Sequence, residues 1–404
     1  MRDLQGVRVL ELGPWINVCY AGKMLADLGA EVIRIESPDG DDQVRLFGPF
    51  PSDEPDPETS GLHLYLNSNK LGVTLRPDTA TGRDLFRDLC RRADVLLACS
   101  PPGFLSASGL DYPSLQRAND RLVVVVISSL GRSGPYAGYK GNDLISWHGG
   151  AIGHIYLGEP DREPLRGVWY QASHWGAFNG AVAAMLALAA REKTGRGQWV
   201  DLSEAEALAL LFLGVEISDF FLFGSSRVRV GTVGLANQAP RLMNRCKNGW
   251  VALQTTAPHQ WEGLVRAMGN PEWAQSELFK GTGLERGRYF QEINDLMKDW
   301  LDSHTAEEIF RLCQAELVPA APLNTIETLC HNQHLAARGY FVDIHHPAAG
   351  PIRVPGAPFR SSGQDPWRVD SPAPLLGQHN EDVYCGMLGL PREDLADLRR
   401  AGVV

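Results

Sequence analysis

Short apolar runs alternate with helical spacing through the first part of the chain. Residues 7–12 are a short apolar run, residues 20–28 carry apolar side chains at helical spacing, and residues 31–35 form a second apolar run. Gly29 stands where the predicted helix ends. A strand, a helix and a second strand within about thirty residues are typical of a doubly wound α/β unit.

The same alternation continues further along the chain. The pattern predicts a helix over residues 81–92 and strands at 95–97 and 122–127. The last of these is a nearly continuous β-branched run, which is typical of a strand covered on both faces of a parallel sheet. The sequence therefore predicts a Rossmann-like large domain over residues 1–220. Ligands of such sheets bind where the loops leave the carboxyl ends of the strands.

A second region, residues 225–330, changes pattern and predicts a smaller α+β domain. Its expected elements are a strand at 250–253 and helices at 261–268, 289–300 and 305–315. From Phe341 onward the chain is rich in Pro and Gly but keeps apolar side chains. Residues 331–404 are therefore expected to return in ordered form across the large domain, because a disordered tail has lower apolar content.

Composition narrows the class of protein. The chain has 404 residues, of which 21% are charged. Its net charge of −10 disfavours a nucleic-acid partner. It has no apolar run long enough for a membrane span and no signal-peptide pattern at its start, so a cytoplasmic location is expected. The seven cysteines include no CxxC pair, and His331, His334, His345 and His346 have no partners at ligand spacing. We expect neither disulfides nor a metal site.

Several stretches, taken together, resemble family III of the CoA-transferases, which includes CaiB/BaiF-like and formyl-CoA transferase-like enzymes. They occur in the family's order along nearly the whole chain, at residues 25–36, 134–136, 141–144, 200–202, 322–325, 334–339 and 372–379. The resemblance implies a Rossmann-like large domain with a smaller α+β domain. It also implies two protomers threaded through each other like linked rings, an active site at each protomer interface, and CoA or acyl-CoA as substrate.

Position 173 departs from the family. Residues 164–173, with the small-residue helix expected at 174–191 and residues 192–198, resemble the family's active-site segment, in which the nucleophile is Asp where this chain has Ser173. A Ser would need a general base and would form a less activated oxygen ester. His174 is adjacent, but neighbours along a helix do not face each other. We expect no catalytic residue in this chain and an N-cap role for Ser173.

The residues that resemble the family's CoA-binding segment are also altered in this chain. After the strand at 95–97, the family has an Asn, an aromatic and a basic residue before Pro-Gly and an Arg shortly afterwards. This chain has Cys-Ser-Pro-Pro-Gly at 99–103 and Ala107 in place of the Arg. CoA binding by this chain is expected to be weakened, because charge-assisted phosphate contacts are lost. Arg34, Lys70 and Lys140 remain candidate phosphate partners, with ordinary surface charge as the alternative for each.

Other residues flank the expected site. Trp147, His148 and Trp169 are candidate pocket residues, with plain packing as the alternative. Gly231 and Gly234 occupy the region of the family's flexible glycine loop, so a lid role is open.

Racemase chemistry on this fold is disfavoured. Asn142 stands where such enzymes have a His, and Ser173 stands where they have an Asp.

Three interpretations remain, and we favour the first. In the first, the chain is a non-catalytic subunit whose homologous partner carries the Asp, in a heterodimer or heterotetramer, as in two-subunit members such as the succinyl-CoA:(R)-benzylsuccinate and succinyl-CoA:malate transferases. The substrates are then an acyl-CoA, with succinyl-CoA as candidate, and a small carboxylic acid, with benzylsuccinate as candidate. In the second, it is a self-sufficient transferase or lyase that uses another group. In the third, it is a non-catalytic binding or regulatory homodimer.

Overall fold

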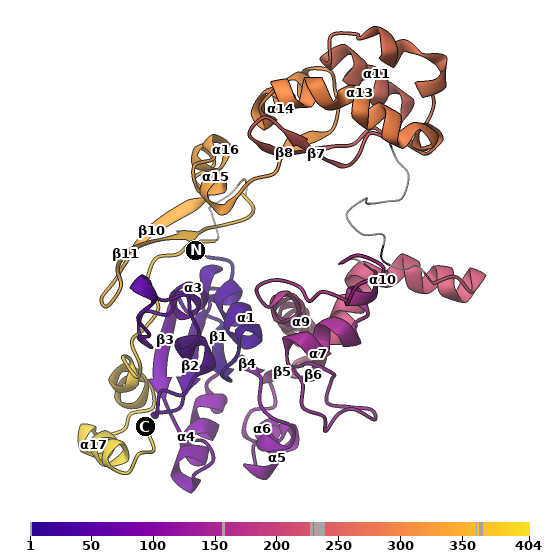
Figure 1. Ribbon diagram of the computed structural model, residues 1–404. Helices are drawn as coiled ribbons and strands as arrows, with labels where there is room; N and C mark the ends of the chain where they lie inside the picture. The colour runs from indigo at the N-terminus through magenta and orange to yellow at the C-terminus, as the bar shows by residue number, and fades with distance from the viewer. Residues whose placement is uncertain (1, 156–157, 227–228, 230–238, 361, 363–366) are drawn as a thin grey trace. The chain divides into compact units, whose positions relative to one another are not determined.

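The computed structural model of the chain describes residues 2–155, 158–226, 229, 239–360, 362 and 367–404 (Figure 1). Contacts divide the chain into two compact units. The first comprises residues 1–153, 166–226 and 336–404, and the second comprises residues 154–165 and 227–335. The domain boundaries expected at 1–220, 225–330 and 331–404 stay a prediction.

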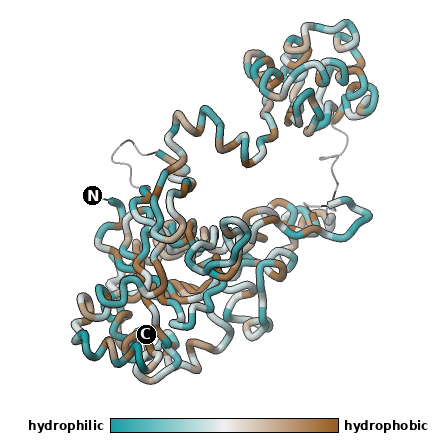
Figure 2. The backbone as a smooth tube through the Cα atoms, turned by 60° about the vertical axis from the view of Figure 1, so that its left-hand side comes forward, coloured by the Kyte–Doolittle hydropathy of each residue, from teal (hydrophilic) through white to brown (hydrophobic). Residues whose placement is uncertain are grey.

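The first unit is built on a six-stranded parallel sheet in the order β3-β2-β1-β4-β5-β6, which confirms the expected α/β class. The apolar runs of the sequence form its central strands, which are buried. Figure 2 shows the hydropathy of each residue along the backbone. The strands are β1 (Arg8–Leu12), β2 (Glu31–Glu36), β3 (Lys70–Thr74), β4 (Val95–Ala98), β5 (Val123–Ser128) and β6 (Trp199–Ser203).

Helices cover both faces of this sheet, as a doubly wound fold requires. One face packs against α1 (Ile16–Asp27) and α9 (Gln171–Thr194), and the other against α4 (Ala80–Arg91) and α6 (Tyr112–Ala118). Small residues let α9 approach closely. A Cβ added at Gly180 would lie 2.5 Å from Ile127 Cδ1, so α9 meets β5 where only a glycine fits.

The C-terminal segment belongs to the first unit. It contains the antiparallel hairpin β10 (Phe341–His346) and β11 (Gly350–Pro355), a π-helical turn at Glu381–Met387, and α17 (Arg392–Arg400). The Tyr384 hydroxyl donates to the Thr74 carbonyl at 2.7 Å and Asn380 Nδ2 donates to Thr74 Oγ1 at 2.8 Å. These buried bonds fix the returning chain to the end of β3.

The second unit has its own apolar core around Trp261, Leu264, Ile293 and Met297. Its three-stranded antiparallel sheet has the order β7-β8-β9. The elements are β7 (Met243–Cys246), β8 (Gly249–Leu253), β9 (Ala320–Pro322), α11 (Pro258–Ala267), α12 (Gly283–Arg286), α13 (Phe290–Ser303), α14 (Ala306–Ala315) and α15 (Ile326–Cys330).

The remaining helices are mostly short, except α10. They are α2 (Gln43–Leu46), α3 (Gly61–Leu66), α5 (Phe104–Ala107), α7 (Asp143–Gly149), α8 (Ile152–Ile155), α10 (Glu204–Phe223) and α16 (Gln333–Ala337). Within the described ranges, no helix is long and apolar enough to cross a membrane.

Candidate active site at the carboxyl ends of the parallel strands

The strand order reverses between β1 and β4, and ligands of open α/β sheets bind in the crevice outside such a point. A pocket of about 490 Å³ lies there in the first unit, and we call it the switch-point pocket. The loops after β1, β4 and β5 line it, together with the start of α10. The lining residues include Trp15, Asn17, Cys99, Ser100, Ser128, Arg132, Lys140 and Glu204.

Ser173 lies beside this pocket but is fully buried. Its hydroxyl accepts a hydrogen bond from the indole Nε1 of Trp15 at 2.9 Å, and Trp15 itself lines the pocket. The N-cap role expected for Ser173 is wrong, because α9 begins at Gln171 and Tyr170 is its N-cap. Ser173 is the third residue of the helix, so its hydroxyl is held by Trp15 instead of capping the first turn.

A carboxylate caps this end of α9 from another helix. Asp143, the first residue of α7, is buried, and its Oδ1 accepts a hydrogen bond from the Ser173 backbone N–H at 2.9 Å. A carboxylate near a helix N-terminus is stabilised by unpaired N–H groups and by the helix dipole.

His174 does not serve as a base for Ser173 in this arrangement. Its Nδ1 lies 2.9 Å from the Tyr170 carbonyl oxygen and its ring packs on Tyr20 with centroids 5.1 Å apart. Burial lowers the pKa of His174.

The backbone entering α9 is strained. Trp169 and Tyr170 have φ angles of 52° and 57°, the left-handed region that is uncommon for residues with large side chains. The Tyr170 ring meets Trp15 edge-on with centroids 5.0 Å apart, which secures the turn. Strained backbone of this kind persists where surrounding contacts hold it, and it concentrates at functional sites.

Glu204 is the single Asp or Glu among the residues that line the switch-point pocket. It is 1% exposed, and its two carboxyl oxygens accept hydrogen bonds from Asn17 Nδ2 at 2.8 Å and Ser146 Oγ at 2.6 Å. Burial raises the pKa of Glu204, the two hydrogen bonds oppose the shift, and nearby Asp143 adds to it. A Cβ added at Gly176 would lie 2.6 Å from Glu204 Cγ, so α9 leaves room for this side chain.

A second pocket, of about 460 Å³, follows the carboxyl ends of β1 to β4, and we call it the acidic pocket. It shares residues 99–101 with the switch-point pocket. Its one lining cation in the described chain is Arg76, which is paired with Asp39. Its acidic lining residues are Glu36, Asp39, Asp41, Asp42 and Asp78. Local charge here opposes a phosphate ligand instead of attracting one.

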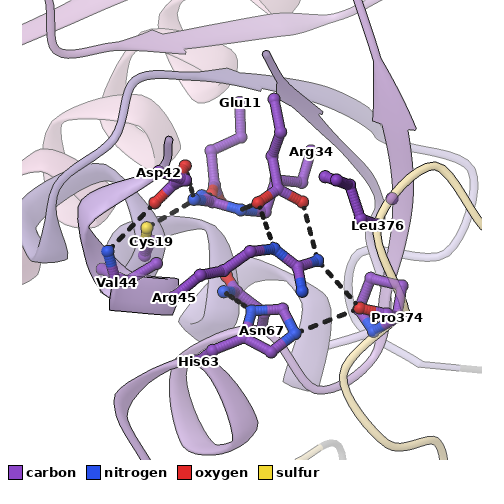
Figure 3. Close-up of polar contacts among 12 residues, drawn as sticks. Glu11, Cys19, Arg34, Asp42, Val44, Arg45, His63, Asn67, Pro374 and Leu376 are labelled. Atoms are coloured by element: carbon purple, nitrogen blue, oxygen red, sulfur yellow. Dashed lines mark hydrogen bonds and ion pairs between the residues drawn. The ribbon is translucent and has the colours of Figure 1, made fainter. Parts of the chain in front are cut away.

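Two of the candidate phosphate partners, Arg34 and Lys70, lie inside the first unit, in a group that we call the buried ionic cluster. The cluster comprises Glu11, Arg34, Glu36, Asp42, Arg45 and Lys70. Figure 3 labels four of these residues, namely Glu11, Arg34, Asp42 and Arg45. The Arg34 guanidinium pairs with both Glu11 and Asp42. Lys70 Nζ donates to Glu11 Oε2, the Cys19 carbonyl and Asn67 Oδ1 at 2.7, 2.7 and 2.8 Å. An ammonium has three N–H donors, so Lys70 has none to offer a phosphate.

Arg45 extends the cluster to the C-terminal segment. Its guanidinium donates to both oxygens of Glu36, at 2.7 and 3.0 Å, and to the Pro374 carbonyl at 3.1 Å (Figure 3). Burial alone would raise the pKa of Glu36, but Arg34 and Arg45 lower it to about 2. Burial raises the pKa of Asp42 to about 6, against the opposing effect of Arg34. The cluster therefore joins β1, β2 and β3 to the returning chain.

The remaining predicted site residues are dispersed. Lys140 is exposed and lines the switch-point pocket. Trp147 is buried, and His148 and Trp169 are exposed, and none of the three lines either pocket described above. Gly231 and Gly234 lie outside the described residues. Within the described ranges, no group of three or more His, Cys, Asp or Glu is placed to hold a metal ion.

Sequence reasoning missed Trp15, Asn17, Arg132, Asp143 and Glu204 as site residues. Arg132 follows β5 and lines the switch-point pocket. Glu204 opens a helix, where acidic residues are common for reasons of helix stability, so it carried no distinctive signal. Trp15 and Asn17 follow the turn after β1, at the edge of the sheet where the sequence predicts ligand binding. No spacing in the sequence selects these two residues.

Comparison with known proteins identifies the class that this fold and site define. The pattern of CoA-transferase family III matches residues 4–380. The chain belongs to that family, whose members are enzymes that use CoA thioesters as substrates.

Individual relatives agree with this assignment. The chain is 33% identical to the succinyl-CoA–D-citramalate CoA-transferase of Chloroflexus aurantiacus, over 100% of this chain and 98% of that one. It is 32% identical to a subunit of the succinyl-CoA:(R)-benzylsuccinate CoA-transferase of Thauera aromatica, over 98% and 95%. A CaiB/BaiF family protein from Brucella suis has the same fold, with a TM-score of 0.82, 28% identity and coverage of 95% and 99%.

Proposed function

We propose that this chain is a subunit of a two-component family III CoA-transferase, and that it does not itself form the covalent intermediates. A homologous partner supplies the nucleophilic Asp, in a heterodimer or heterotetramer of interlocked protomers. CoA moves from an acyl-CoA to a small carboxylic acid, with succinyl-CoA and benzylsuccinate as our candidate pair. The observation that carries the proposal is Ser173, which is fully buried and held by Trp15.

The chemistry of the family disfavours a serine in this role. A carboxylate nucleophile attacks the thioester carbonyl, and the CoA thiolate leaves and then returns to the resulting anhydride, so each intermediate stays activated. A serine hydroxyl would yield an oxygen ester that is less activated than a thioester. His174 does not act as a base for Ser173, because its ring is turned toward the Tyr170 carbonyl.

The names of relatives support the subunit and the substrate class. One relative is named as a subunit, and both relatives described above carry succinyl-CoA in their names. These names describe those proteins, and we extend them to this chain as candidates for its donor and its mode of assembly.

Exposed apolar side chains support a partner chain. The last turn of α10 exposes Phe220, Phe221, Leu222 and Phe223 by 54 to 81%. On α9, Phe178, Val182, Met185 and Leu186 are also exposed and line an apolar groove of about 330 Å³. Contiguous apolar surface of this kind marks interaction sites in proteins that remain in solution. It is the surface that we assign to the partner protomer.

Weak CoA binding by this chain is part of the proposal. Residues 99–103 present no basic side chain. The adjoining acidic pocket is lined by one arginine, Arg76, which is paired with Asp39, and Asp41 and Asp78 add further negative charge. Arg and Lys side chains bind phosphate through strong charge-assisted hydrogen bonds, and unpaired carboxylates nearby oppose such binding. We expect the partner's site to bind the nucleotide of CoA. The proposal keeps the cytoplasmic location expected from the sequence.

Co-purification from the native host, with mass spectrometry of the bound chains, tests the assembly. We expect an Asp-bearing homologue to co-purify, and CoA transfer to require both chains. Transfer by the isolated chain would contradict the subunit role and favour a self-sufficient enzyme. A homodimer without activity and without an Asp-bearing partner would favour a binding or regulatory protein.

A further inference from the structure

The nucleophile position lies against the switch-point pocket without opening into it. Ser173 is fully buried and is not one of the described residues that line the pocket. Trp15 does line the pocket, and its indole Nε1 donates to the Ser173 hydroxyl at 2.9 Å. Because the Trp15 side chain is partly exposed, it contacts the pocket and Ser173 at once. The indole therefore forms the part of the pocket wall that covers Ser173.

A second pocket-lining side chain covers the next turn of the same helix. Gly176 follows Ser173 by three residues on α9, and residues at this spacing share a helix face. A Cβ added at Gly176 would lie 2.6 Å from Glu204 Cγ, so Glu204 packs directly on that turn. Trp15 and Glu204 both line the pocket. The two side chains therefore lie between this face of α9 and the pocket, with Trp15 at the nucleophile position.

Three contacts fix the orientation of the indole. Its ring meets the Phe47 and Tyr170 rings edge-on, with centroids 6.1 and 5.0 Å apart and interplanar angles of 82° and 84°. Edge-to-face geometry at these separations is favourable for aromatic pairs. The third contact is the hydrogen bond to Ser173, which satisfies the one polar group of the indole. Trp15 is therefore held by three separate residues, one of which stands at the nucleophile position.

We propose that Trp15 closes the nucleophile position of this chain, and that Ser173 is the acceptor that holds the indole in the closed orientation. The inference rests on the proposed function, which places the family's nucleophile at residue 173, and it names the residue that shields this position. Attack on a thioester requires the nucleophilic atom and the carbonyl carbon to approach to about 3–3.5 Å. A thioester in the switch-point pocket meets the indole at this wall and is kept from residue 173. Closure by Trp15 therefore prevents the covalent step independently of the loss of the carboxylate.

Burial of Ser173 has a second explanation, in which the packing of α9 alone protects the side chain. Asp143 contacts residue 173 through the backbone N–H, so this contact does not hold the hydroxyl. The hydrogen bond of the hydroxyl within the described chain is the one from Trp15. The two explanations predict different results when Trp15 is made smaller. Closure by the indole predicts that residue 173 becomes accessible from the pocket, and protection by α9 predicts no change.

Thiol labelling of the full-length Ser173→Cys variant measures access to this position. Methyl methanethiosulfonate is the probe, because it is small and converts a thiolate to a methyl disulfide with release of methanesulfinate. Mass spectrometry of the digested chain gives a separate rate for each cysteine. The exposed Cys330 reports the reactivity of the reagent, and the buried Cys90 reports any loss of folding.

We expect slow labelling at position 173 while Trp15 is present. Adding Trp15→Val should raise that rate at least about tenfold, because a local opening lowers the protection of a buried group without global unfolding. The Cys90 and Cys330 rates should not change. Trp15→Phe keeps a ring but has no N–H donor, so its rate should lie between the two. Tyr139→Val is the matched control, since Tyr139 lines the same pocket and packs against Tyr136, and it should leave position 173 protected.

Three results would overturn the inference: rapid labelling at position 173 with Trp15 intact, an equal rate in the Trp15→Val background, or an equal rise in the Tyr139→Val background. If Trp15→Val also exposes Cys90, it has unfolded, and an unchanged rate in Trp15→Phe then overturns the inference in its place. The proposed function fails separately. Transfer by the isolated wild-type chain, with labelling that follows Trp15, refutes the function alone. Transfer that requires both chains, with labelling that is independent of Trp15, refutes the inference alone.

Discussion

The buried ionic cluster and the switch-point pocket lie in the same unit and use their charged side chains in opposite ways. In the cluster, Arg34 and Lys70 are enclosed by carboxylates and backbone oxygens of the protein. In the pocket, Arg132 and Lys140 line a cavity whose one carboxyl group, that of Glu204, has a pKa raised by burial. A cation is available to a ligand only where the protein has not already neutralised it, and the local sequence does not reveal which case applies.

The largest expected effect is on the cluster. Glu36→Gln should lower the free energy of unfolding of the chain by about 3–5 kcal/mol, because it removes the buried carboxylate that pairs with Arg45. Urea denaturation followed by circular dichroism measures the change. Glu58→Gln is the matched control, since this partner of Arg45 is 27% exposed and should cost less than about 1 kcal/mol. Similar small losses in both variants would show that the cluster is not a structural unit.

Lowering the pH should reduce the stability that the same cluster contributes. The pKa of Glu36 is lowered from 4.5 to about 2, so Glu36 contributes stability above its unfolded value, and this contribution is lost as the pH falls from about 4.5 to about 2. The difference in unfolding free energy between the wild type and Glu36→Gln should shrink over that window. Burial raises the pKa of Asp42 to about 6 and Glu36 adds to the rise, so Asp42 contributes in the opposite sense and part of the measured difference reflects its titration. A constant difference across the window would contradict the assignment.

The acidic pocket should show a smaller effect on CoA. Asp39→Asn combined with Asp78→Asn should strengthen CoA binding by the isolated chain severalfold at low salt, because it removes two anions from the pocket. Calorimetry at two salt concentrations measures the change. Asp84→Asn, on the exposed side of α4, is the control. If the wild type binds CoA tightly and prefers it strongly to dephospho-CoA, the proposed loss of phosphate contacts is wrong.

The smallest effect on turnover is expected at Ser173, the residue that stands in place of the family's nucleophilic Asp. Ser173→Ala should leave turnover of the two-chain complex within about twofold and cost about 1 kcal/mol of stability, the usual contribution of one hydrogen bond, here that from Trp15. The partner's Asp→Ala is the comparison and should abolish transfer. A large loss of turnover in the Ser173 variant, with folding intact, would give Ser173 a chemical role.

Periodicity predicted the parallel strands well because their apolar residues are buried on both faces, as in β5. Periodicity predicted that α9 starts at residue 174, whereas the helix begins at Gln171. The residue before it, Tyr170, has a left-handed backbone conformation, which no local sequence pattern predicts. The pairing of Arg34 and the position of Glu204 at the pocket depend on contacts between residues that are distant in the sequence, such as Glu11 with Arg34 and Asn17 with Glu204. Such contacts follow from the fold, so the sequence alone could suggest the site's location but not its charged residues.

Gly176 gives a way to sort relatives from their sequences alone. Its missing side chain leaves the space that Glu204 fills, because a Cβ there would lie 2.6 Å from Glu204 Cγ. An alanine or larger residue at the equivalent position would force a glutamate opposite it to move. Related chains that carry a glutamate in this position should therefore also carry the glycine.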